Sequence, residues 1–266
     1  MTIQDRVALP EIAEKTMVLA TDLDGTFLGG SPEARRALYD WIEENRDTVG
    51  LIFVTGRDPE FIAGLVEAEG TPWPDFAVGD VGTTIARVSP EDGVEPIEEL
   101  EEQIAAIWND AGDAVRARLD GWPGLRLQPT PFRYRVSYDL DAAEFDEGAK
   151  AAVEEMGHDW LISDNRYFDV LPRGISKGPS LKRLMAHLGI AEGRVLAAGD
   201  TLNDYSLLTA GVPAVAVGNS EAPLKDALAG GDHPRLYHAT GHGCAGIAEA
   251  ITHFDLHPTG ATAHAK

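Results

Sequence analysis

The sequence predicts an α/β fold in which a mostly parallel sheet is interrupted by a smaller α+β domain. Short, continuous apolar runs alternate with amphipathic helical patterns towards both ends of the 266-residue chain. Such runs are typical of strands that are buried on both faces of a parallel sheet. The middle of the chain instead repeats the order helix–strand–strand, which favours an antiparallel sheet with helices on one face. We therefore expect two domains, the second inserted into the first.

The first part of the chain alternates strands with helices. The run MVLA at residues 17–20 is a buried strand, and Ser31, which a proline follows, is suited to be the N-cap of a helix. The run LIFV at residues 51–54 is a second buried strand, and Asp58 with the next proline begins another helix. DFAVGDVGTTI, at residues 75–85, reads as a further strand and its turn.

The middle of the chain is predicted to form the inserted domain. We place this domain at residues 89–171 and the larger domain at residues 1–88 and 172–266. In the insertion, an amphipathic helix over residues 104–119 precedes two strands, LRLQPT and RYRVSYDL. A second helix, at residues 142–156, precedes the strands WLIS and RYFDVLP. The predicted order is therefore αββαββ.

The α/β pattern returns from residue 177 onwards. GPSLKRLMAHLGI is predicted as a helix and RVLAAGD as a buried strand. NDYSLLTAG follows as a helix and VPAVAVGNS as another strand. The two outer parts of the chain therefore share one pattern, as expected if they form a single Rossmann-like sheet domain.

The composition limits the classes of partner. The formal net charge of −22 argues against nucleic acid and anionic membranes, because both would repel the surface. A small anionic substrate stays compatible where a few cationic groups converge. The single cysteine, Cys244, excludes a disulfide framework. The N-terminal stretch MTIQDRVALPEIAEK lacks the apolar core of a signal peptide, so we expect a cytoplasmic protein, as a monomer or homodimer.

Polar side chains follow three of the predicted parallel strands at their carboxyl ends, where ligands bind in open parallel sheets. A lysine in the turn SKG begins a predicted helix, and a further aspartate lies one turn into the next helix. Folding of the sheet would gather these groups at one edge. The residues expected there are Asp22, Asp24, Thr55, Lys177, Asp200 and Asp204.

This combination favours phosphoryl transfer with a bound divalent cation. Four carboxylates at close range need a compensating charge, and oxygen ligands alone suit Mg²⁺. The expected metal residues are Asp22, Asp24, Asp200 and Asp204. Lys177 adds a second positive charge, and Thr55 with nearby backbone N–H groups can hold phosphate oxygens. Those N–H groups belong to Asp24, Gly25 and Gly56.

Two carboxylates separated by one leucine can divide the chemistry between them. Asp22, directly after the strand, is placed to attack phosphorus and form an aspartyl-phosphate. Asp24 can protonate the leaving alkoxide and later activate water to hydrolyse the intermediate. Gly25 permits the tight turn that this arrangement needs.

The motifs DLDGT, VTGR, SKG and GDTLND, in this order, resemble those of haloacid dehalogenase superfamily phosphatases. The insertion between VTGR and SKG is similar to a C2-type cap of the IIB variety. DLDGTFLGG, VGTTI, VSYDLD, FDVLPRGISKG and ATGHGCAGIAEAITHF resemble sucrose-phosphate phosphatases and their bacterial relatives, which include mannosylfructose-phosphate phosphatase. One departure is Thr84, where that family often has an acidic residue, and it weakens any transfer of sugar specificity.

The resemblance implies a role for each matching residue. Asp22 would be the nucleophile and Asp24 the acid/base, while Thr55 and Lys177 would bind phosphate. Mg²⁺ would be held by Asp22, the backbone carbonyl of Asp24, and Asp200, with Asp204 close by. Asn203 would lie near phosphate or a metal-bound water.

Several further residues are candidates for substrate contact, although each also has a plain structural interpretation. Arg57 follows the phosphate-binding turn and could instead pair with a surface acid. The polar face of the strand RYRVSYDL could simply be solvated, and SDN could be only a hairpin turn. The full set of predicted substrate-binding residues is Gly25, Gly56, Arg57, Asn203, Arg133, Arg135, Ser163, Asp164 and Asn165.

We therefore expect a Mg²⁺-dependent phosphatase that acts on a disaccharide or glycoside phosphate of the sucrose 6-phosphate or mannosylfructose phosphate type. One alternative is a phosphomannomutase-like phosphotransferase, in which a sugar hydroxyl replaces water as the acceptor. Another is a promiscuous monosaccharide-phosphate phosphatase. A phospho-accepting receiver module also uses Asp, Thr and Lys around Mg²⁺, but such modules are shorter and carry neither a cap nor an acid/base. A catalytically silent relative is disfavoured by the intact set of motifs.

Overall fold

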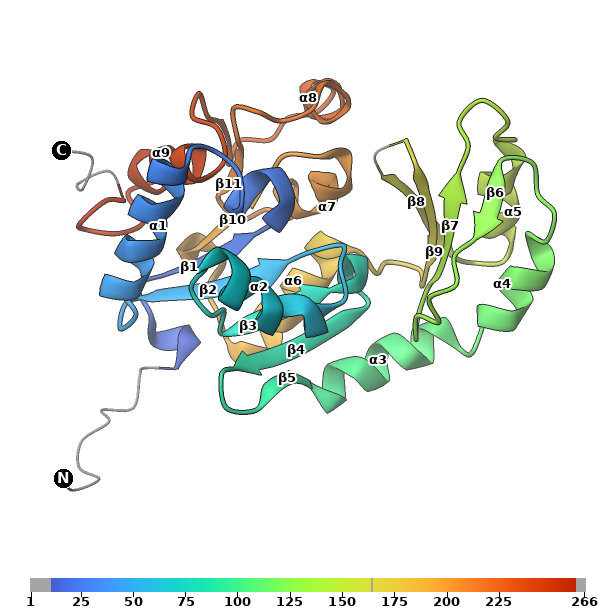
Figure 1. The fold of residues 1–266 in the computed structure, drawn as a ribbon, viewed down its shortest axis with the longest axis horizontal. Helices are drawn as coiled ribbons and strands as arrows, with labels where there is room; N and C mark the ends of the chain where they lie inside the picture. The colour runs from blue at the N-terminus through green and yellow to red at the C-terminus, as the bar shows by residue number, and fades with distance from the viewer. Residues whose placement is uncertain (1–10, 164, 262–266) are drawn as a thin grey trace.

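The computed structural model describes residues 11–163 and 165–261, which form two sheets of different size (Figure 1). The larger sheet has eight strands in the order β12-β11-β10-β1-β2-β3-β4-β5. Strands β12 to β3 in this order are parallel, and β4 and β5 are antiparallel. The strands are β1 Met17–Thr21, β2 Val49–Val54, β3 Phe76–Gly79, β4 Thr84–Ser89, β5 Gly93–Pro96, β10 Val195–Gly199, β11 Ala214–Ala216 and β12 Leu236–His238.

Helices cover both faces of the larger sheet, which confirms the predicted α/β fold. Helices α1, α2 and α9 pack on one face, and α6, α7 and α8 pack on the other. These helices are α1 Pro32–Glu44, α2 Ile62–Glu69, α6 Lys177–Leu188, α7 Tyr205–Leu208, α8 Ala222–Ala229 and α9 Cys244–His253.

Strand β1 shows why the central strands read as continuous apolar runs. Val18 and Ala20 belong to the hydrophobic cluster on the face covered by α6 to α8. Met17 and Leu19 belong to the cluster under α1 and α9. Because successive side chains of a strand point to opposite faces and both faces are covered, every position of β1 is buried.

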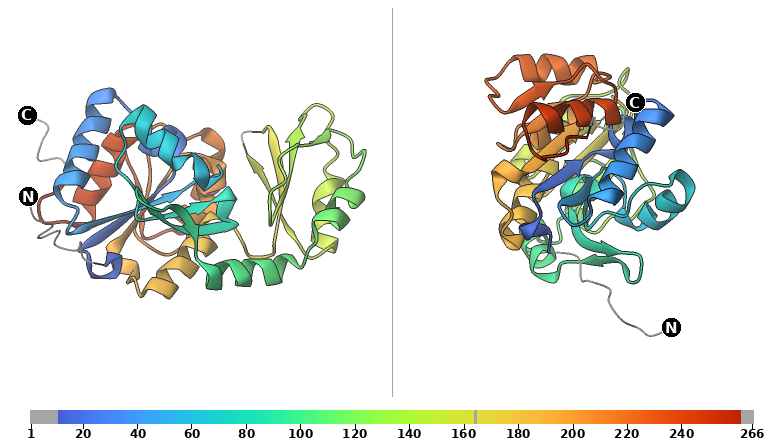
Figure 2. Two further views of the ribbon diagram at one scale, coloured as in Figure 1. Left: turned by 60° about the horizontal axis from the view of Figure 1, so that its bottom comes forward. Right: turned by 90° about the vertical axis from the view of Figure 1, so that its left-hand side faces the viewer.

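The smaller sheet has four antiparallel strands in the order β6-β7-β9-β8, and we call it with its helices the cap. Figures 1 and 2 show that α4 and α5 cover its far face and that its other face is turned towards the larger sheet. Helix α3 runs between the two sheets. The elements are α3 Glu98–Trp108, α4 Gly112–Arg118, β6 Leu125–Leu127, β7 Val136–Leu140, α5 Gly148–Glu155, β8 Asp159–Ser163 and β9 Tyr167–Leu171.

The cap differs in detail from the predicted αββαββ order. The helix predicted over residues 104–119 is broken into α3 and α4, because Asn109 and Asp110 adopt left-handed backbone conformations with φ of 50° and 53°. The helix predicted at residues 142–156 is shortened to α5. The cap thus contains three helices where the periodicity predicted two.

The predicted domain boundary at residue 89 does not coincide with the edge of the larger sheet. Strand β5 pairs with β4 in that sheet, although residues 93–96 were assigned to the insertion. The division into domains at residues 89 and 172 otherwise stays a prediction. The prediction also left out α8, β12 and α9, although Cys244, Ile247 and Ile251 of α9 recur at helical spacing and are buried. No helix in the described part of the chain combines the length and apolarity needed to cross a membrane.

Candidate active site

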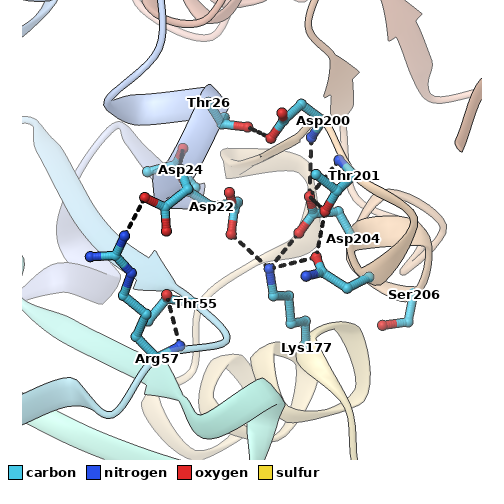
Figure 3. Close-up of polar contacts among 12 residues, drawn as sticks. Asp22, Asp24, Thr26, Thr55, Arg57, Lys177, Asp200, Thr201, Asp204 and Ser206 are labelled. Carbon is cyan, nitrogen blue, oxygen red and sulfur yellow. Dashed lines mark hydrogen bonds and ion pairs between the residues drawn. The ribbon is translucent and has the colours of Figure 1, made fainter. Parts of the chain in front are cut away.

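The functional side chains predicted at strand ends meet at one edge of the larger sheet (Figure 3). Asp22 follows β1, Thr55 follows β2 and Asp200 follows β10. Strands β10, β1 and β2 are parallel neighbours, so their carboxyl ends lie side by side. The amide of Asp22 donates a hydrogen bond to the carbonyl of Ala198 at 2.9 Å, which ties the ends of β1 and β10 together.

Lys177 lies at the centre of this cluster. It is the first residue of α6, and its side chain is completely buried. The ammonium Nζ donates to Asp22 Oδ1 at 2.7 Å, Asp204 Oδ1 at 2.6 Å and Asn203 Oδ1 at 2.9 Å. Burial alone would lower the pKa of Lys177, but Asp204 and Asp22 outweigh that effect and raise it. The lysine is therefore a fixed cation at neutral pH.

Asp22 is a buried carboxylate in a crowded acidic environment. Burial raises its pKa well above the ordinary value, and the charges of Asp204 and Asp200 raise it further, while Lys177 opposes both effects. Lys177 engages Oδ1, and the side chain also lines the cavity between sheet and cap. The negative charge of Asp22 therefore requires cationic compensation, and its predicted role as a nucleophile stays a prediction.

Asp200 is held against the turn that follows β1. Its Oδ1 accepts a hydrogen bond from the Thr26 hydroxyl at 2.7 Å. Burial raises the pKa of Asp200 to about 7; the Thr26 hydrogen bond opposes this shift and the charge of Asp204 adds to it. Gly25 has φ of +82°, and a Cβ there would lie 2.2 Å from Asp200 Oδ2. Only glycine satisfies both the turn and this close approach.

Asp204 has a supporting position in the structure. It lies in the helical turn Leu202–Asp204, and its Oδ2 accepts from the amides of Asp200 and Thr201 at 3.0 Å each. Its Oδ1 accepts from Lys177, so both oxygens are engaged. Asp204 therefore positions the lysine and the end of β10, and its predicted role as a metal ligand stays a prediction.

The residues present fit a hard divalent cation. Carboxylate oxygens of Asp22, Asp200 and Asp204 lie within 4.8 Å of one another. All donors are oxygen atoms, which Mg²⁺ prefers. Burial and neighbouring acids raise the pKa values of Asp22 and Asp200, although Lys177 acts to lower both. A cation beside them would relieve this repulsion.

Asp24 is separated from the acidic cluster and pairs with Arg57. Arg57 Nη2 lies 2.5 Å from Asp24 Oδ1, and both side chains are about half exposed. The guanidinium also lies over the Phe61 ring, with its carbon 5.1 Å from the ring centre. Both Asp24 and Arg57 line the cavity. Asp24 therefore lies at the cavity beside Arg57, apart from the carboxylates of Asp22, Asp200 and Asp204, and its predicted acid/base role stays a prediction.

The turn Thr55–Arg57, predicted to bind phosphate, is held by two hydrogen bonds within the protein. Thr55 Oγ1 accepts from the amide of Arg57 at 3.1 Å, and the amide of Thr55 donates to Val78 O at 2.8 Å. A Cβ on Gly56 would have its nearest neighbour, Val81, at 3.9 Å. Packing therefore does not require glycine at this position, but its absence of a side chain leaves room in the cavity.

A cavity of about 550 Å³ lies between this edge of the sheet and the cap. Its volume is within the range of small-ligand sites. The larger sheet and its loops contribute acidic, amide and phosphate-turn residues, and the cap contributes hydroxyl, amide and charged groups. The lining residues are Asp22, Asp24, Thr55, Gly56, Arg57, Val81, Gln128, Arg135, Ser163, Tyr167, Asp169, Thr201 and Asn203.

Only some of the cap residues predicted to contact substrate line the cavity. Arg135 and Ser163 line the cavity. Arg133 is not among the described residues that line it, because its guanidinium pairs with Glu101 at 2.6 and 2.7 Å. Asn165 is exposed, with φ of 52°, in the turn between β8 and β9. Asp164, also predicted, lies outside the described residues.

Several residues of the site were missed by sequence reasoning. Gln128, Tyr167 and Asp169 line the cavity from the cap, and no local pattern identified them. Asn219 donates through Nδ2 to Gly25 O at 2.9 Å and accepts from the amide of Gly243 at 2.8 Å, so it supports the turn after β1. Its position after the strand VPAVAV was a usable signal, because that strand is parallel to β10.

Comparisons with known proteins identify the family of this chain. The family model for sucrose-6F-phosphate phosphohydrolase matches residues 15–255. Glucosylglycerol-phosphate synthase of Pseudomonas anguilliseptica is 38% identical over 239 residues, which cover 90% of this chain and 31% of that protein. Mannosylfructose-phosphate phosphatase of Agrobacterium fabrum is 28% identical over 254 residues, which cover 91% and 98% of the two chains. The chain thus spans about a third of the length of the synthase and nearly all of the phosphatase.

A solved structure shares the whole fold. The sucrose-phosphatase from Synechocystis, crystallised in complex with sucrose and phosphate, has a TM-score of 0.81 and 26% sequence identity. The similarity covers 91% of this chain and 98% of that one, so it includes both sheets. The chain therefore belongs to the sucrose-6F-phosphate phosphohydrolase family.

Proposed function

We propose that this protein is a Mg²⁺-dependent phosphatase that hydrolyses the phosphate ester of a small glycoside through an aspartyl-phosphate on Asp22. The observation that carries the proposal is the position of Asp22. Its carboxylate is buried at the end of β1, is held by Lys177, and lines the cavity that the cap covers. Such a group can attack phosphorus where charge is compensated on both sides.

The reaction divides into two balanced steps. In the first, an Asp22 oxygen forms a bond to phosphorus while the bond to the sugar oxygen breaks, and Asp24 donates a proton to the departing alkoxide. In the second, Asp24 takes a proton from water, whose oxygen attacks phosphorus and releases Asp22 together with inorganic phosphate. Thr55 and the turn that follows it hold the phosphoryl oxygens, and Lys177 keeps Asp22 in position.

Asp22, the backbone carbonyl of Asp24 and Asp200 are the groups that would hold Mg²⁺. When bound, the cation neutralises negative charge on the phosphoryl oxygens. Asp204 supports this arrangement through its bonds to Lys177 and to the backbone at Asp200. The chain's own part is therefore to hold the nucleophile and to exclude bulk water with the cap.

The names of the relatives support a glycoside phosphate as the substrate. They refer to sucrose phosphate, mannosylfructose phosphate and glucosylglycerol phosphate. Each of these compounds joins a sugar to a second sugar or a polyol, and each carries one phosphate. The cap side of the cavity offers Gln128, Ser163 and Tyr167, which are neutral groups that can bind hydroxyls. A cavity with these groups suits an uncharged, hydroxyl-rich leaving group.

Phosphate release from a panel of esters tests the proposal. The panel contains glucosylglycerol phosphate, sucrose 6-phosphate, mannosylfructose phosphate, trehalose 6-phosphate, glucose 6-phosphate and hexose 1-phosphates, each with Mg²⁺ and with EDTA. We expect fast, EDTA-sensitive release from one glycoside phosphate. Similar slow release from all members would indicate a promiscuous monosaccharide phosphatase. Conversion of hexose 1-phosphate without phosphate release would indicate a phosphotransferase.

The acid/base role of Asp24 has its own test. Asp24→Asn is expected to lower kcat by about 10²- to 10⁴-fold, the usual contribution of a general acid/base. Inorganic phosphate should still bind, since the phosphate turn and Lys177 are untouched. Near-normal turnover by this variant would contradict the assignment.

A further inference from the structure

Arg135 connects the cap to the phosphate-binding turn. Its side chain is 7% exposed, and its Nη1 lies 3.4 Å from Asp169 Oδ1 in the cap. Its Nη2 donates to Gly56 O and to Asp80 Oδ1, both at 3.4 Å and both outside the cap. The guanidinium carbon lies 3.6 Å from the centre of the Phe132 ring. One buried arginine therefore contacts three acceptors in two parts of the molecule.

The residues on the core side of this contact also hold the phosphate turn. The amide of Asp80 donates to Arg57 O at 2.9 Å, and the amide of Val81 donates to Thr55 O at 3.2 Å. Both Asp80 and Val81 have positive φ, of 52° and 61°. This conformation is unusual for a β-branched residue and is found where the surrounding structure imposes it, often at functional sites. The Asp80–Val81 turn is thus shaped to fit against Thr55–Arg57.

The cap side of the contact is also fixed. Asp169 on β9 lies opposite Ser137 on β7, whose hydroxyl donates to Asp169 Oδ1. Burial raises the pKa of both Asp169 and Asp80, and Arg135 opposes the shift in each case. Arg135 is therefore a cation that both carboxylates share, the buried Asp169 and the partly buried Asp80.

We propose that Arg135 is a positioning residue for phosphate binding, which acts through Asp80 and the Gly56 carbonyl to hold the phosphate turn against the seated cap. This inference rests on the proposed function for the identity of the turn. The two Nη groups of Arg135 donate to acceptors in both parts of the molecule, so the side chain is held by the protein itself. A lysine could not replace it, because a single ammonium lacks the planar fork that spans separate acceptors.

Two substitutions separate this role from simple charge. Arg135→Lys keeps the charge but loses the fork, and Asp80→Asn keeps the shape but removes a negative charge. We expect both variants to weaken binding of inorganic phosphate to the Mg²⁺-loaded enzyme, with Arg135→Lys about tenfold weaker, equivalent to about 1.4 kcal/mol. The KM for p-nitrophenyl phosphate and for the glycoside phosphate should rise by a similar factor, while kcat changes less than about threefold. The double variant should bind inorganic phosphate no more weakly than the more impaired of the two single variants, because both substitutions remove the contact between Arg135 and Asp80.

Calorimetric titration with inorganic phosphate gives the decisive result. Tighter phosphate binding by Asp80→Asn would overturn the proposal, because it would show a purely electrostatic effect. Unchanged binding would overturn it as well, because Asp80 would then have no part in holding the turn. A loss confined to the glycoside phosphate, with p-nitrophenyl phosphate unaffected, would overturn it in favour of a sugar ligand. Arg126→Lys is the matched control, since Arg126 is a largely exposed arginine on the cap and should change nothing.

The same experiments distinguish a failure of the positioning role of Arg135 from a failure of the proposed phosphatase function. Thermal unfolding checks that each variant is folded, and if Asp80→Asn is not, Arg135→Lys decides by itself. Wild-type protein that binds inorganic phosphate but hydrolyses none of the panel esters would refute the proposed function. The effect of Arg135→Lys on phosphate affinity would still be measurable in that case.

Discussion

The two walls of the cavity are built differently. The wall formed by the larger sheet holds its charges through short bonds, with Lys177 at 2.6 to 2.9 Å from its three oxygen acceptors. The cap wall contacts the core through Arg135, whose three polar contacts are all at 3.4 Å, and through Arg133, which donates to Thr84 Oγ1 at 3.4 Å. Beside the charged Arg135 and Asp169, this wall offers the neutral groups of Gln128, Ser163 and Tyr167. Under the proposed function, the closely bonded charges of the larger sheet would carry out the reaction, and the groups of the cap would select the substrate.

The largest expected effect comes from substitution of Asp22, the proposed nucleophile, in the wall formed by the larger sheet. Asp22→Asn should lower kcat by at least about 10⁴-fold for every ester, because no other group can accept the phosphoryl group. Folding should not suffer, since the carboxylate that burial and its neighbours disfavour is removed. The measurement is phosphate release together with thermal unfolding. Residual turnover within tenfold of wild type would contradict the proposed role of Asp22 as nucleophile, on which the comparison of the two cavity walls depends.

Substitution of Lys177 tests whether its short hydrogen bonds to the neighbouring side-chain oxygens stabilise the fold. Lys177→Met should leave Asp22 and Asp204 as buried carboxylates without their cation, which costs about 3 to 5 kcal/mol of unfolding free energy at pH 8. The loss should shrink at low pH, where Asp22, whose pKa burial raises, takes up a proton. Denaturant unfolding at both pH values measures it. Lys182→Met, on the exposed face of the same helix, is the control and should change stability by less than about 0.5 kcal/mol.

Asp200 gives a pH-dependent prediction. Its folded-state pKa of about 7 lies above the ordinary 3.8, so the charged form is disfavoured in the folded state. Without metal, its contribution to stability should therefore fall as the pH rises through that window. At pH 8, metal-free Asp200→Asn should unfold about 3 °C or more above wild type, and near pH 3.8 the two should converge.

Addition of Mg²⁺ sharpens the same comparison. The cation should raise the unfolding temperature of wild type at pH 8 and should raise that of Asp200→Asn much less, because one carboxylate ligand is missing. A variant that is less stable than wild type without metal at pH 8 would contradict the view that this carboxylate is under-compensated.

The smallest effect is expected on the cap wall. Tyr167→Phe removes one hydroxyl from the cavity and should raise KM for the glycoside phosphate about fivefold, the value of one neutral hydrogen bond. It should leave p-nitrophenyl phosphate unaffected, since that ester lacks the sugar. Equal losses with both esters would show that the cap also contributes to the reaction itself.

The sequence by itself determined the arrangement on the larger sheet. Asp22, Thr55 and Asp200 follow apolar strands directly, and in a parallel sheet the carboxyl ends of neighbouring strands share one edge. Local order along the chain was therefore enough to bring them together. Lys177 was placed in the same way, because the helix that it begins packs next to these strands.

Only the tertiary structure decided the partners across the cavity. Arg133 and Arg135 are two residues apart, yet one pairs with Glu101 and the other reaches Asp80 and Gly56. Their spacing along the chain cannot specify this, since it depends on how the cap lies against the core. The physical reason is range: strand ends are set by local hydrophobic pattern and sheet geometry, whereas contacts between two separately packed sheets are set by the balance of many long-range interactions.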